Sequence, residues 1–160
     1  MRSFLFKWII NIWPPFWGSG ISVKTVSRDF RFVEVRLKAR FFNRNWVGTH
    51  YGGSLYSMTD AFYMIMLLEN LGKEFIVWDK AAKINFVKPG KGTVVAKFHL
   101  TQFQIDEVRS RAVELEKYVF DIPVQVVSQA SGEVVAEVVK TLYVRHKKAD
   151  KAYIAQSAKF

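Results

Sequence analysis

The sequence predicts an α+β domain in which a largely antiparallel sheet wraps around one long buried helix. Strand-like runs follow one another through short turns, and between them lies an apolar segment without glycine or proline. The length of 160 residues suits one domain. Half of the residues are hydrophobic and 16% are aromatic, so the chain has enough apolar surface for a buried core.

Residues 1–17, MRSFLFKWIINIWPPFW, form an N-terminal segment of their own. Pro14-Pro15 ends an apolar run that is shorter than the roughly 18 residues needed to cross a bilayer, and no small-residue cleavage site of a signal peptide follows. The larger apolar residues recur at helical spacing and predict a short amphipathic helix: Leu5, Trp8, Ile9, Ile12 and Trp13. This helix is expected either to pack on the domain or to contact a membrane surface or an acyl chain.

We expect the domain to occupy residues 18–146. Alternation of apolar and polar residues predicts its first two strands. In Arg31–Ala39 the apolar residues take every second position, which is the pattern of a half-buried strand. Ile21–Ser27 is expected to be its hairpin partner. The segment 147–160 is polar and is expected to form a C-terminal tail.

The long helix is predicted over Ser54–Leu71, after a polar loop. The segment SLYSMTDAFYMIMLLENL is apolar almost all the way round, which is typical of a buried helix. Gly72 is expected to be its C-cap.

Further strand-like runs follow this helix. Lys88–Gly92 predicts a hairpin between residues 75–87 and 93–101, and Ala130–Gly132 predicts another between residues 118–129 and 133–145. Between these turns, apolar residues at helical spacing predict a short surface helix: Ile105, Val108, Ala112 and Leu115.

The formal net charge of +10 is compatible with nucleic acid, an anionic membrane surface or a phosphate-bearing small molecule. The basic residues are scattered and no nucleic-acid-binding motif is found, so we expect no nucleic-acid partner. The chain has no cysteine, and its three histidines are far apart, so we expect neither a disulfide nor a metal site. The lack of cysteine fits a reducing, cytoplasmic location.

The loop and the start of the buried helix resemble the hotdog-fold acyl-CoA thioesterases of the phenylacetate-pathway type. In that family Asn-x-x-Gly precedes His-Gly-Gly, and an Asp follows seven residues after the second Gly. Asn45–Gly48 matches the first part, Gly52-Gly53 matches the glycine pair, and Asp60 matches the acid. The segment Ile84–Gly90 also resembles the family's hairpin from the third to the fourth strand.

One position departs from this family pattern. The family histidine directly precedes the glycine pair, whereas this chain has Tyr51 there and His50 one residue earlier. This variant resembles an uncharacterised hotdog subfamily of thioesterase-like proteins.

The resemblance implies a hotdog fold and hydrolysis of an acyl-CoA or acyl-carrier thioester by a homodimer or a dimer of dimers. It implies that Asp60 is the nucleophile or general base and that the Gly53 backbone amide is the oxyanion donor. Coenzyme A would enter as part of the substrate, and no other cofactor is expected.

Helix geometry supports this assignment. The first turn of a helix exposes unpaired N–H groups and the positive end of the helix dipole. Glycines there let a ligand come close to the backbone, so this place is suited to polarising a thioester carbonyl. Gly53 and Asp60 would lie on nearly one helix face but about 10 Å apart along the axis. One thioester cannot contact both in a single subunit, so the site is expected to be shared between two subunits.

Each candidate residue also has a structural role open to it. Asp60 could be a carboxylate held by Tyr56, Ser57 or Tyr63, because a buried carboxylate needs partners. His50 and Asn45 could serve catalysis or could hold the loop. Lys88 and Lys91 could meet coenzyme A phosphates or could be solvated turn lysines. The candidate substrate contacts are Gly48, Tyr51, Gly52, Ser57, Met64, Lys88 and Lys91.

Two other functions are compatible with the sequence. The first is a non-catalytic module that binds acyl-CoA or lipid, with residues 1–17 touching a membrane. The second is a hotdog dehydratase acting on a hydroxyacyl thioester, although the usual motifs of those enzymes are absent.

Overall fold

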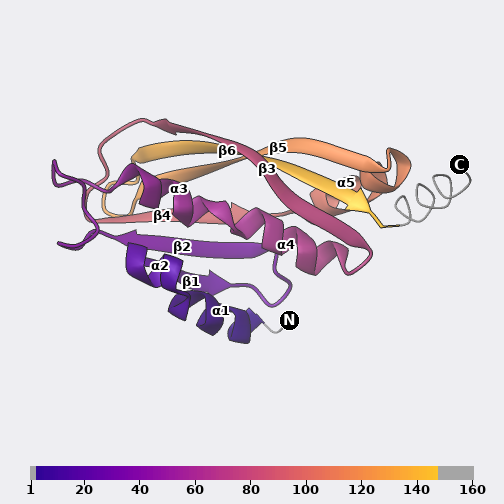
Figure 1. Ribbon diagram of the computed structural model, residues 1–160, viewed down its shortest axis with the longest axis horizontal. Coiled ribbons are helices and arrows are strands. Elements are labelled where there is room, and N and C mark those ends of the chain that lie inside the picture. The colour runs from indigo at the N-terminus through magenta and orange to yellow at the C-terminus, as the bar shows by residue number, and fades with distance from the viewer. Residues whose placement is uncertain (1–2, 148–160) are drawn as a thin grey trace, which may run out of the picture.

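The computed structural model describes residues 3–147, and within them a six-stranded sheet wraps around a central helix (Figure 1). The strands are β1 (Ile21–Val26), β2 (Phe32–Lys38), β3 (Phe75–Phe86), β4 (Thr93–His99), β5 (Lys117–Ser128) and β6 (Val134–His146). The helices are α1 (Ser3–Ile12), α2 (Pro14–Ser19), α3 (Gly52–Asp60), α4 (Phe62–Leu71) and α5 (Gln102–Glu114). Every neighbouring strand pair is antiparallel, so the predicted α+β architecture is confirmed. The predicted tail lies, apart from Lys147, outside the described residues.

The predicted hairpin between residues 75–87 and 93–101 is wrong. The strand order is β1-β2-β4-β5-β6-β3, so β3 is an edge strand beside β6, and β4 lies between β2 and β5. Glycine and proline mark where a chain changes direction but not which strands then pair. The connection is held instead by the Val87 and Lys88 amides, which donate to the Val135 carbonyl at 2.9 and 3.1 Å.

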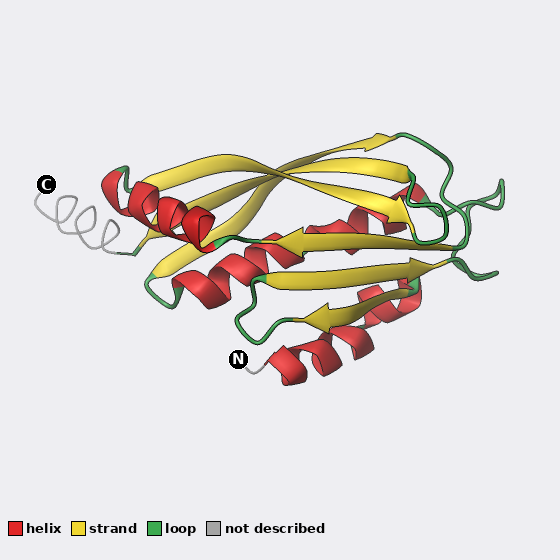
Figure 2. Cartoon of the chain, turned by 180° about the vertical axis from the view of Figure 1, so that it is seen from behind, coloured by secondary structure: helices red, strands yellow, loops and turns green. Residues whose placement is uncertain are grey.

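The central helix lies against one face of the sheet, and from behind it is seen crossing the molecule behind and between the strands (Figure 2). It is two segments, α3 and α4, with Ala61 between them, and not the single uninterrupted helix predicted. The hydroxyls of Ser57 and Thr59 donate to the carbonyls of Gly53 and Tyr56 at 2.8 and 2.7 Å. Such bonds bend helices, which accounts for the break after Asp60.

Only one side of this helix is buried in a single chain. Met58, Phe62 and Met66 are completely inaccessible to solvent. Asp60 and Met64 are only partly covered. The prediction of a helix buried all round is therefore wrong for the single chain, because the sheet reaches only one side.

The N-terminal segment is two helices, and not one. Trp13, held extended before a proline, separates them, and Pro14 begins α2 because proline is favoured in a first helical turn. Phe6, Ile10 and Phe16 are buried against the domain. The predicted apolar stripe faces outward instead, with exposed side chains at Leu5, Trp8, Ile9, Ile12 and Trp13.

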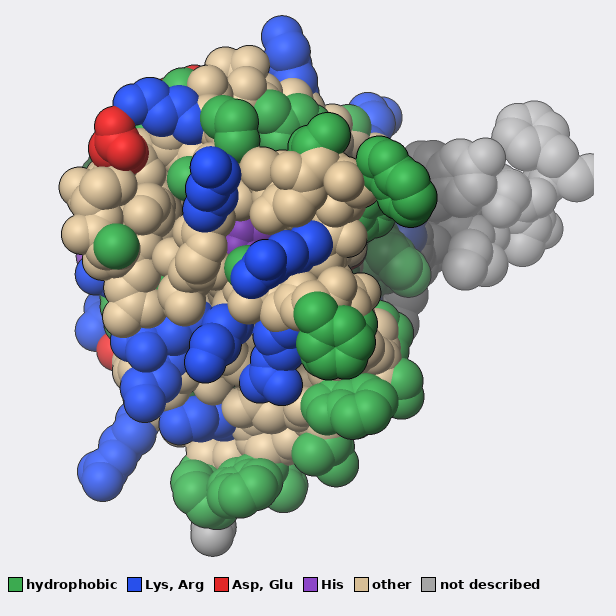
Figure 3. Space-filling model, turned by 90° about the vertical axis from the view of Figure 1, so that its left-hand side faces the viewer, with side chains coloured by type: hydrophobic (Ala, Val, Ile, Leu, Met, Phe, Trp, Pro, Cys, Tyr) green, Lys and Arg blue, Asp and Glu red, His purple; other side chains and the backbone are tan. Residues whose placement is uncertain are grey.

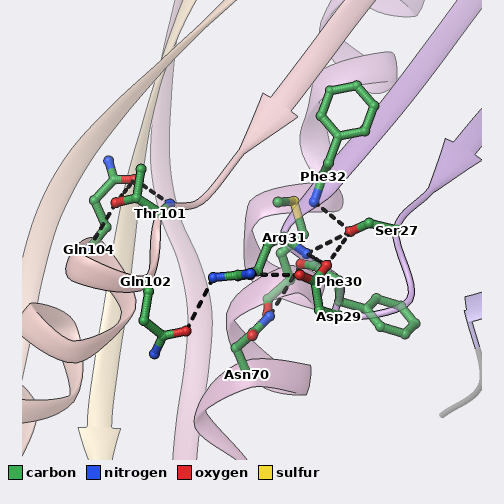
Figure 4. Close-up of polar contacts among 10 residues, drawn as sticks. Ser27, Asp29, Phe30, Arg31, Phe32, Asn70, Thr101, Gln102 and Gln104 are labelled. Carbon is green, nitrogen blue, oxygen red and sulfur yellow. Dashed lines mark hydrogen bonds and ion pairs between the residues drawn. The ribbon is translucent and has the colours of Figure 1, made fainter.

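Hydrogen bonds fix the opposite end of the central helix (Figure 4). The Ser27 hydroxyl, at the turn between β1 and β2, accepts from the amides of Arg31 and Phe32 at 3.0 and 2.9 Å. The Asn70 amide, at the end of α4, donates to the carbonyl of Phe30 in the same turn at 3.2 Å. The predicted C-cap is confirmed, since the Gly72 amide donates to the Leu68 carbonyl.

The second predicted hairpin and the predicted surface helix are both confirmed. Residues between β5 and β6 form the predicted hairpin. The predicted surface helix is α5, in which Ile105, Val108 and Ala112 are buried. Leu115 does not join them, because it lies just beyond the last turn and is exposed.

Truncation of Met58 is expected to destabilise the protein. Met58→Ala should lower the free energy of unfolding by about 3 kcal/mol, because it leaves a cavity between the central helix and the sheet. Val113→Ala, on an exposed position of α5, should cost less than about 0.5 kcal/mol. Urea unfolding measures both, and equal losses would contradict the packing of Met58 between the central helix and the sheet.

Candidate active site

A pocket of about 360 Å³ lies at the N-terminus of α3. The loop before the helix, the first turn of the helix and the connection from β3 to β4 surround it. Its lining residues include Asn45, His50, Gly52, Leu55, Phe86 and Lys88. The connection from β3 to β4 therefore forms part of the wall of this pocket.

The first turn of α3 offers backbone N–H groups beside this pocket. The carbonyl of Tyr51, the N-cap residue, accepts from the amides of Ser54 and Leu55 at 3.0 and 3.2 Å. The amides of Gly52 and Gly53, which precede them, find no acceptor within residues 3–147. These two N–H groups are thus available to a ligand.

At both glycines an aromatic ring lies close to where a Cβ atom would be. A Cβ atom at Gly52 would lie 3.0 Å from Cζ of Phe86. A Cβ atom at Gly53 would clash with the ring of Tyr51, which lies over it and is largely exposed. Tyr51, at the position of the histidine in the phenylacetate-pathway motif, therefore places its ring over the helix start.

The side chain of Asn45 is used inside the loop. Its amide nitrogen donates to the Thr49 hydroxyl at 2.8 Å and to the His50 carbonyl at 3.3 Å. Its oxygen accepts from the amides of Val47 and Thr49 at 3.2 and 3.0 Å. Gly48 completes the turn with a φ of +81°, a left-handed conformation that favours glycine.

His50 is buried and tied to the backbone of the next segment. Its Nε2 lies 3.1 Å from the carbonyl oxygen of Gly92, and its amide donates to the Gly90 carbonyl at 2.9 Å. Burial lowers the pKa of the His50 imidazole, against the opposing effect of the Gly92 carbonyl. The hydrogen bond to the Gly92 carbonyl requires a proton on Nε2. In the neutral imidazole Nδ1 then carries no proton and is an acceptor, so His50 in this position cannot donate a hydrogen bond to a thioester carbonyl.

The two candidate lysines differ in their surroundings. The ammonium of Lys88 forms an ion pair with Glu133, on the neighbouring hairpin. Lys91 is exposed and has no ion-pair partner within residues 3–147. Basic side chains gather on this end of the molecule (Figure 3).

Asp60 lies outside the pocket, on the partly covered side of the central helix. The ammonium of Lys140, from β6, donates to its Oδ1 at 2.7 Å and lies 3.2 Å from Oδ1 of Asp79 on β3. Lys140 is almost completely buried, whereas 49% of the Asp60 side chain is exposed. One cation therefore holds two carboxylates, with Asp60 turned to the outside.

The pKa values reflect this arrangement. Burial lowers the pKa of Lys140, but the hydrogen bond to Asp60 and the charges of Asp79 and Asp60 outweigh burial and raise it. Burial raises the pKa of Asp79, and Lys140 only partly opposes this. Burial likewise raises the pKa of Tyr56, whose ring lies 5.4 Å from the Lys140 ammonium. Lys140 thus remains a cation between its two carboxylates.

Seven of the predicted site residues fall into two groups in a single chain, and the other four, Gly48, Tyr51, Gly53 and Lys91, do not line the pocket. Asn45, His50, Gly52 and Lys88 line the pocket. Ser57, Asp60 and Met64 lie along the partly covered side of the helix. None of these three lines the pocket.

Sequence reasoning missed Lys140 and Asp79, although the pattern contained a signal. Val138, Lys140 and Leu142 occupy successive inward positions of β6, so a lysine stands where an apolar residue is expected. Asp79 follows Val77 at an inward position of β3 in the same way. A lysine and an aspartate on the buried sides of two strands indicate a partnered charge cluster.

A family model, described as a domain of unknown function (DUF4442), matches residues 2–144. The chain belongs to this DUF4442 family. No curated protein matches it.

Solved structures share its fold at low sequence identity. A Pseudomonas aeruginosa protein described as a probable thioesterase is 21% identical, with a TM-score of 0.82 over 91% of this chain and 97% of that one. A thioesterase from Haemophilus influenzae is 12% identical, with a TM-score of 0.65 over 92% of each chain. The PaaI protein of the E. coli phenylacetic acid degradation operon is 17% identical, with a TM-score of 0.56 over 86% and 87%. The hotdog fold predicted for this DUF4442 member is confirmed.

The described part of this DUF4442 chain contains no group of three His, Cys, Asp or Glu side chains that could hold a metal ion. Within residues 3–147, none of the helices has the length and apolar character needed to cross a membrane.

Loss of the Lys140 ammonium is expected to destabilise the fold. Lys140→Met should lower the free energy of unfolding by about 3 kcal/mol, because it leaves Asp79 half-buried and unpaired. Adding Asp79→Asn should recover part of that loss, and Lys97→Met, at an exposed strand position, should change little. Chemical unfolding of the three variants tests this, and a fully stable Lys140→Met variant would refute it.

Stability is expected to fall as the pH drops below 6.5 because of His50. The pKa of His50 is lowered in the folded state, so the unfolded chain binds the proton more tightly. The contribution of His50 to stability is therefore fully present above pH 6.5 and decreases as the pH falls from 6.5 to the folded-state pKa. The slope from this group reaches at most about 1.4 kcal/mol per pH unit. Unfolding of His50→Gln between pH 7 and pH 5 should show a shallower dependence than unfolding of the control His99→Gln, and identical profiles would count against it.

Proposed function

We propose that this protein hydrolyses acyl-CoA-type thioesters at a site shared between two subunits. Asp60 is the nucleophile or general base, and the Gly53 backbone amide is the oxyanion donor. One observation carries the proposal: α3 has free N–H groups in its first turn and a lysine-anchored carboxylate two turns later, on a side that the sheet leaves uncovered.

The separation of these groups requires a second subunit. Seven residues of helix place Asp60 about 10 Å beyond Gly53 along the axis. In a dimer with two-fold symmetry, two α3 helices packed antiparallel bring the start of one helix beside the end of the other. The partner subunit's Asp60 would then face the Gly53 amide of this chain.

Two surfaces are suited to that contact. The uncovered side of the central helix includes apolar residues such as Met64 and Leu68. The edge strand β3 runs beside it, and its residues from Lys80 onward are mostly exposed. An open edge strand with an adjacent apolar helix face is a favourable surface for a second copy.

The reaction needs only the groups named. As a general base, Asp60 takes a proton from water, and the resulting hydroxide attacks the thioester carbonyl carbon. The oxyanion accepts a hydrogen bond from the Gly53 amide, the C–S bond breaks, and the thiolate leaves and takes up a proton. As a nucleophile, Asp60 attacks the carbonyl carbon and expels the thiolate, which forms an anhydride, and water then hydrolyses the anhydride to the free acid and the Asp60 carboxylate. In both routes Lys140 positions the carboxylate.

The basic surroundings of the pocket suit the phosphates of coenzyme A. Lys91 is free to reach an anion, while Lys88 must first leave Glu133. A phosphopantetheine carrier presents the same thioester and one phosphate, so both carriers fit this site. Met64 and the neighbouring apolar side chains of the central helix suit the acyl group.

Replacement of the Asp60 carboxylate is expected to abolish most turnover. Asp60→Asn should reduce kcat by a factor of about 10² to 10⁴ with little change in KM, because it removes the base while keeping the shape. Free thiol release from short, medium, long and aromatic acyl-CoAs measures it, with Asp106→Asn on the exposed face of α5 as the matched control. Full turnover by Asp60→Asn on the best substrate would eliminate this mechanism.

A second function is favoured by one observation at His50. Its ring is engaged with the Gly92 carbonyl, and Tyr51 holds the position of the family histidine. The same pocket could then bind an acyl-CoA without turning it over. Tight binding of acyl-CoA by the folded protein, with no thiol released from any substrate, would assign this function.

A further inference from the structure

The outer surface of the two N-terminal helices is almost entirely apolar. Seven large side chains there are exposed, and we call them the N-terminal surface: Phe4, Leu5, Trp8, Ile9, Ile12, Trp13 and Trp17. Trp17 and Ile12 are 73% and 71% exposed. A contiguous apolar surface of this kind marks an interaction site in a water-soluble domain.

The helices are fixed with this surface outward. The Asn11 side chain pairs with the backbone of Val23 on the edge strand β1, accepting from its amide at 2.6 Å and donating to its carbonyl at 3.1 Å. Phe6 packs on Phe30, with 5.6 Å between the ring centres. Phe16 packs on Phe62 of α4 at 5.7 Å. Because Asn11, Phe6 and Phe16 fix the helices in this orientation, the N-terminal surface faces away from the core.

Positive charge accompanies the apolar residues. The sequence contains no acidic residue before Asp29. A groove of about 740 Å³ lies beside α2, and both Trp17 and the basic residues Lys38 and Arg40 line it. In Figure 3 the apolar side chains lie along the bottom of the molecule, directly next to a group of basic ones. Aromatic and aliphatic residues flanked by lysine and arginine are the composition of helices that lie in a bilayer interface.

We propose that the N-terminal surface docks this protein on an anionic phospholipid bilayer. The helices lie parallel to the membrane, their tryptophans enter the headgroup region, and Lys38 and Arg40 contact lipid phosphates. This inference is independent of the proposed hydrolysis.

The charge distribution selects a lipid surface over a second copy of the chain. Self-association through this surface would bring Lys7, Lys38 and Arg40 of two chains together, and no acidic side chain lines the groove. The surface also lies at the β1 edge of the sheet, whereas the open edge is β3, at the opposite end of the strand order.

Vesicle co-sedimentation of the full chain tests the proposal. The protein is mixed with phosphatidylcholine vesicles, with and without about 30% phosphatidylserine, at low salt. We expect binding mainly to the anionic vesicles. Trp8→Ala/Trp17→Ala and Lys38→Glu/Arg40→Glu should each weaken that binding about tenfold or more. Because all four side chains are exposed or line the groove, thermal unfolding should be nearly unchanged.

Matched controls make the result specific. Phe103→Ala/Val113→Ala removes two exposed apolar side chains from α5, away from the N-terminal helices, and should bind vesicles as the unmodified protein does. Three outcomes would overturn the proposal: no binding of the unmodified protein to anionic vesicles, equal binding by all variants, or self-association that requires Trp8 and Trp17 while vesicles are ignored.

Discussion

The packing of one side of the central helix against the curved sheet is the contact on which the rest of the structure depends. Met58, Phe62 and Met66 are completely buried in it. This packing sets the direction of α3, and therefore where its free N–H groups and the Asp60 side chain lie. Because the sheet reaches only one side of the helix, the other side remains partly uncovered in the single chain.

Lys140 and Asp79 form a charge cluster with Asp60, and the position of Asp60 in the packed helix makes such a partner necessary. The helix brings a carboxylate against an apolar sheet, and a carboxylate there needs a partner. Lys140 supplies the partner from the inward face of β6, and Asp79 on β3 shares it. The cation stays buried while half of Asp60 is exposed, so the ion pair positions the carboxylate without enclosing it.

The N-terminal helices serve the sheet in another way. Asn11 pairs with the backbone of β1 and so closes an edge that would otherwise be open to other strands. The other edge, β3, has no such cover within the described residues. The two edges of the sheet therefore differ in their cover, and we propose different partners for them, a lipid surface at β1 and a second chain at β3.

The sequence by itself determined the local structure of this protein. Alternation located β1 and β2, glycines marked the end of α4 and the β5–β6 turn, and the motif from Asn45 to Asp60 pointed to the hotdog fold. The strands and turns depend on residues close together in the chain, where spacing fixes which side chains share a face, whereas the hotdog fold was implied by the resemblance of the motif to a known family.

Only the tertiary structure decided which distant segments meet. The turn signal at Lys88–Gly92 did not reveal that β3 crosses to β6, and nothing local paired Lys140 with Asp60, 80 residues away. The spacing of apolar residues likewise did not predict that the N-terminal apolar stripe faces outward. Periodicity reports that one face of a helix is apolar, whereas the available neighbours decide whether that face is buried.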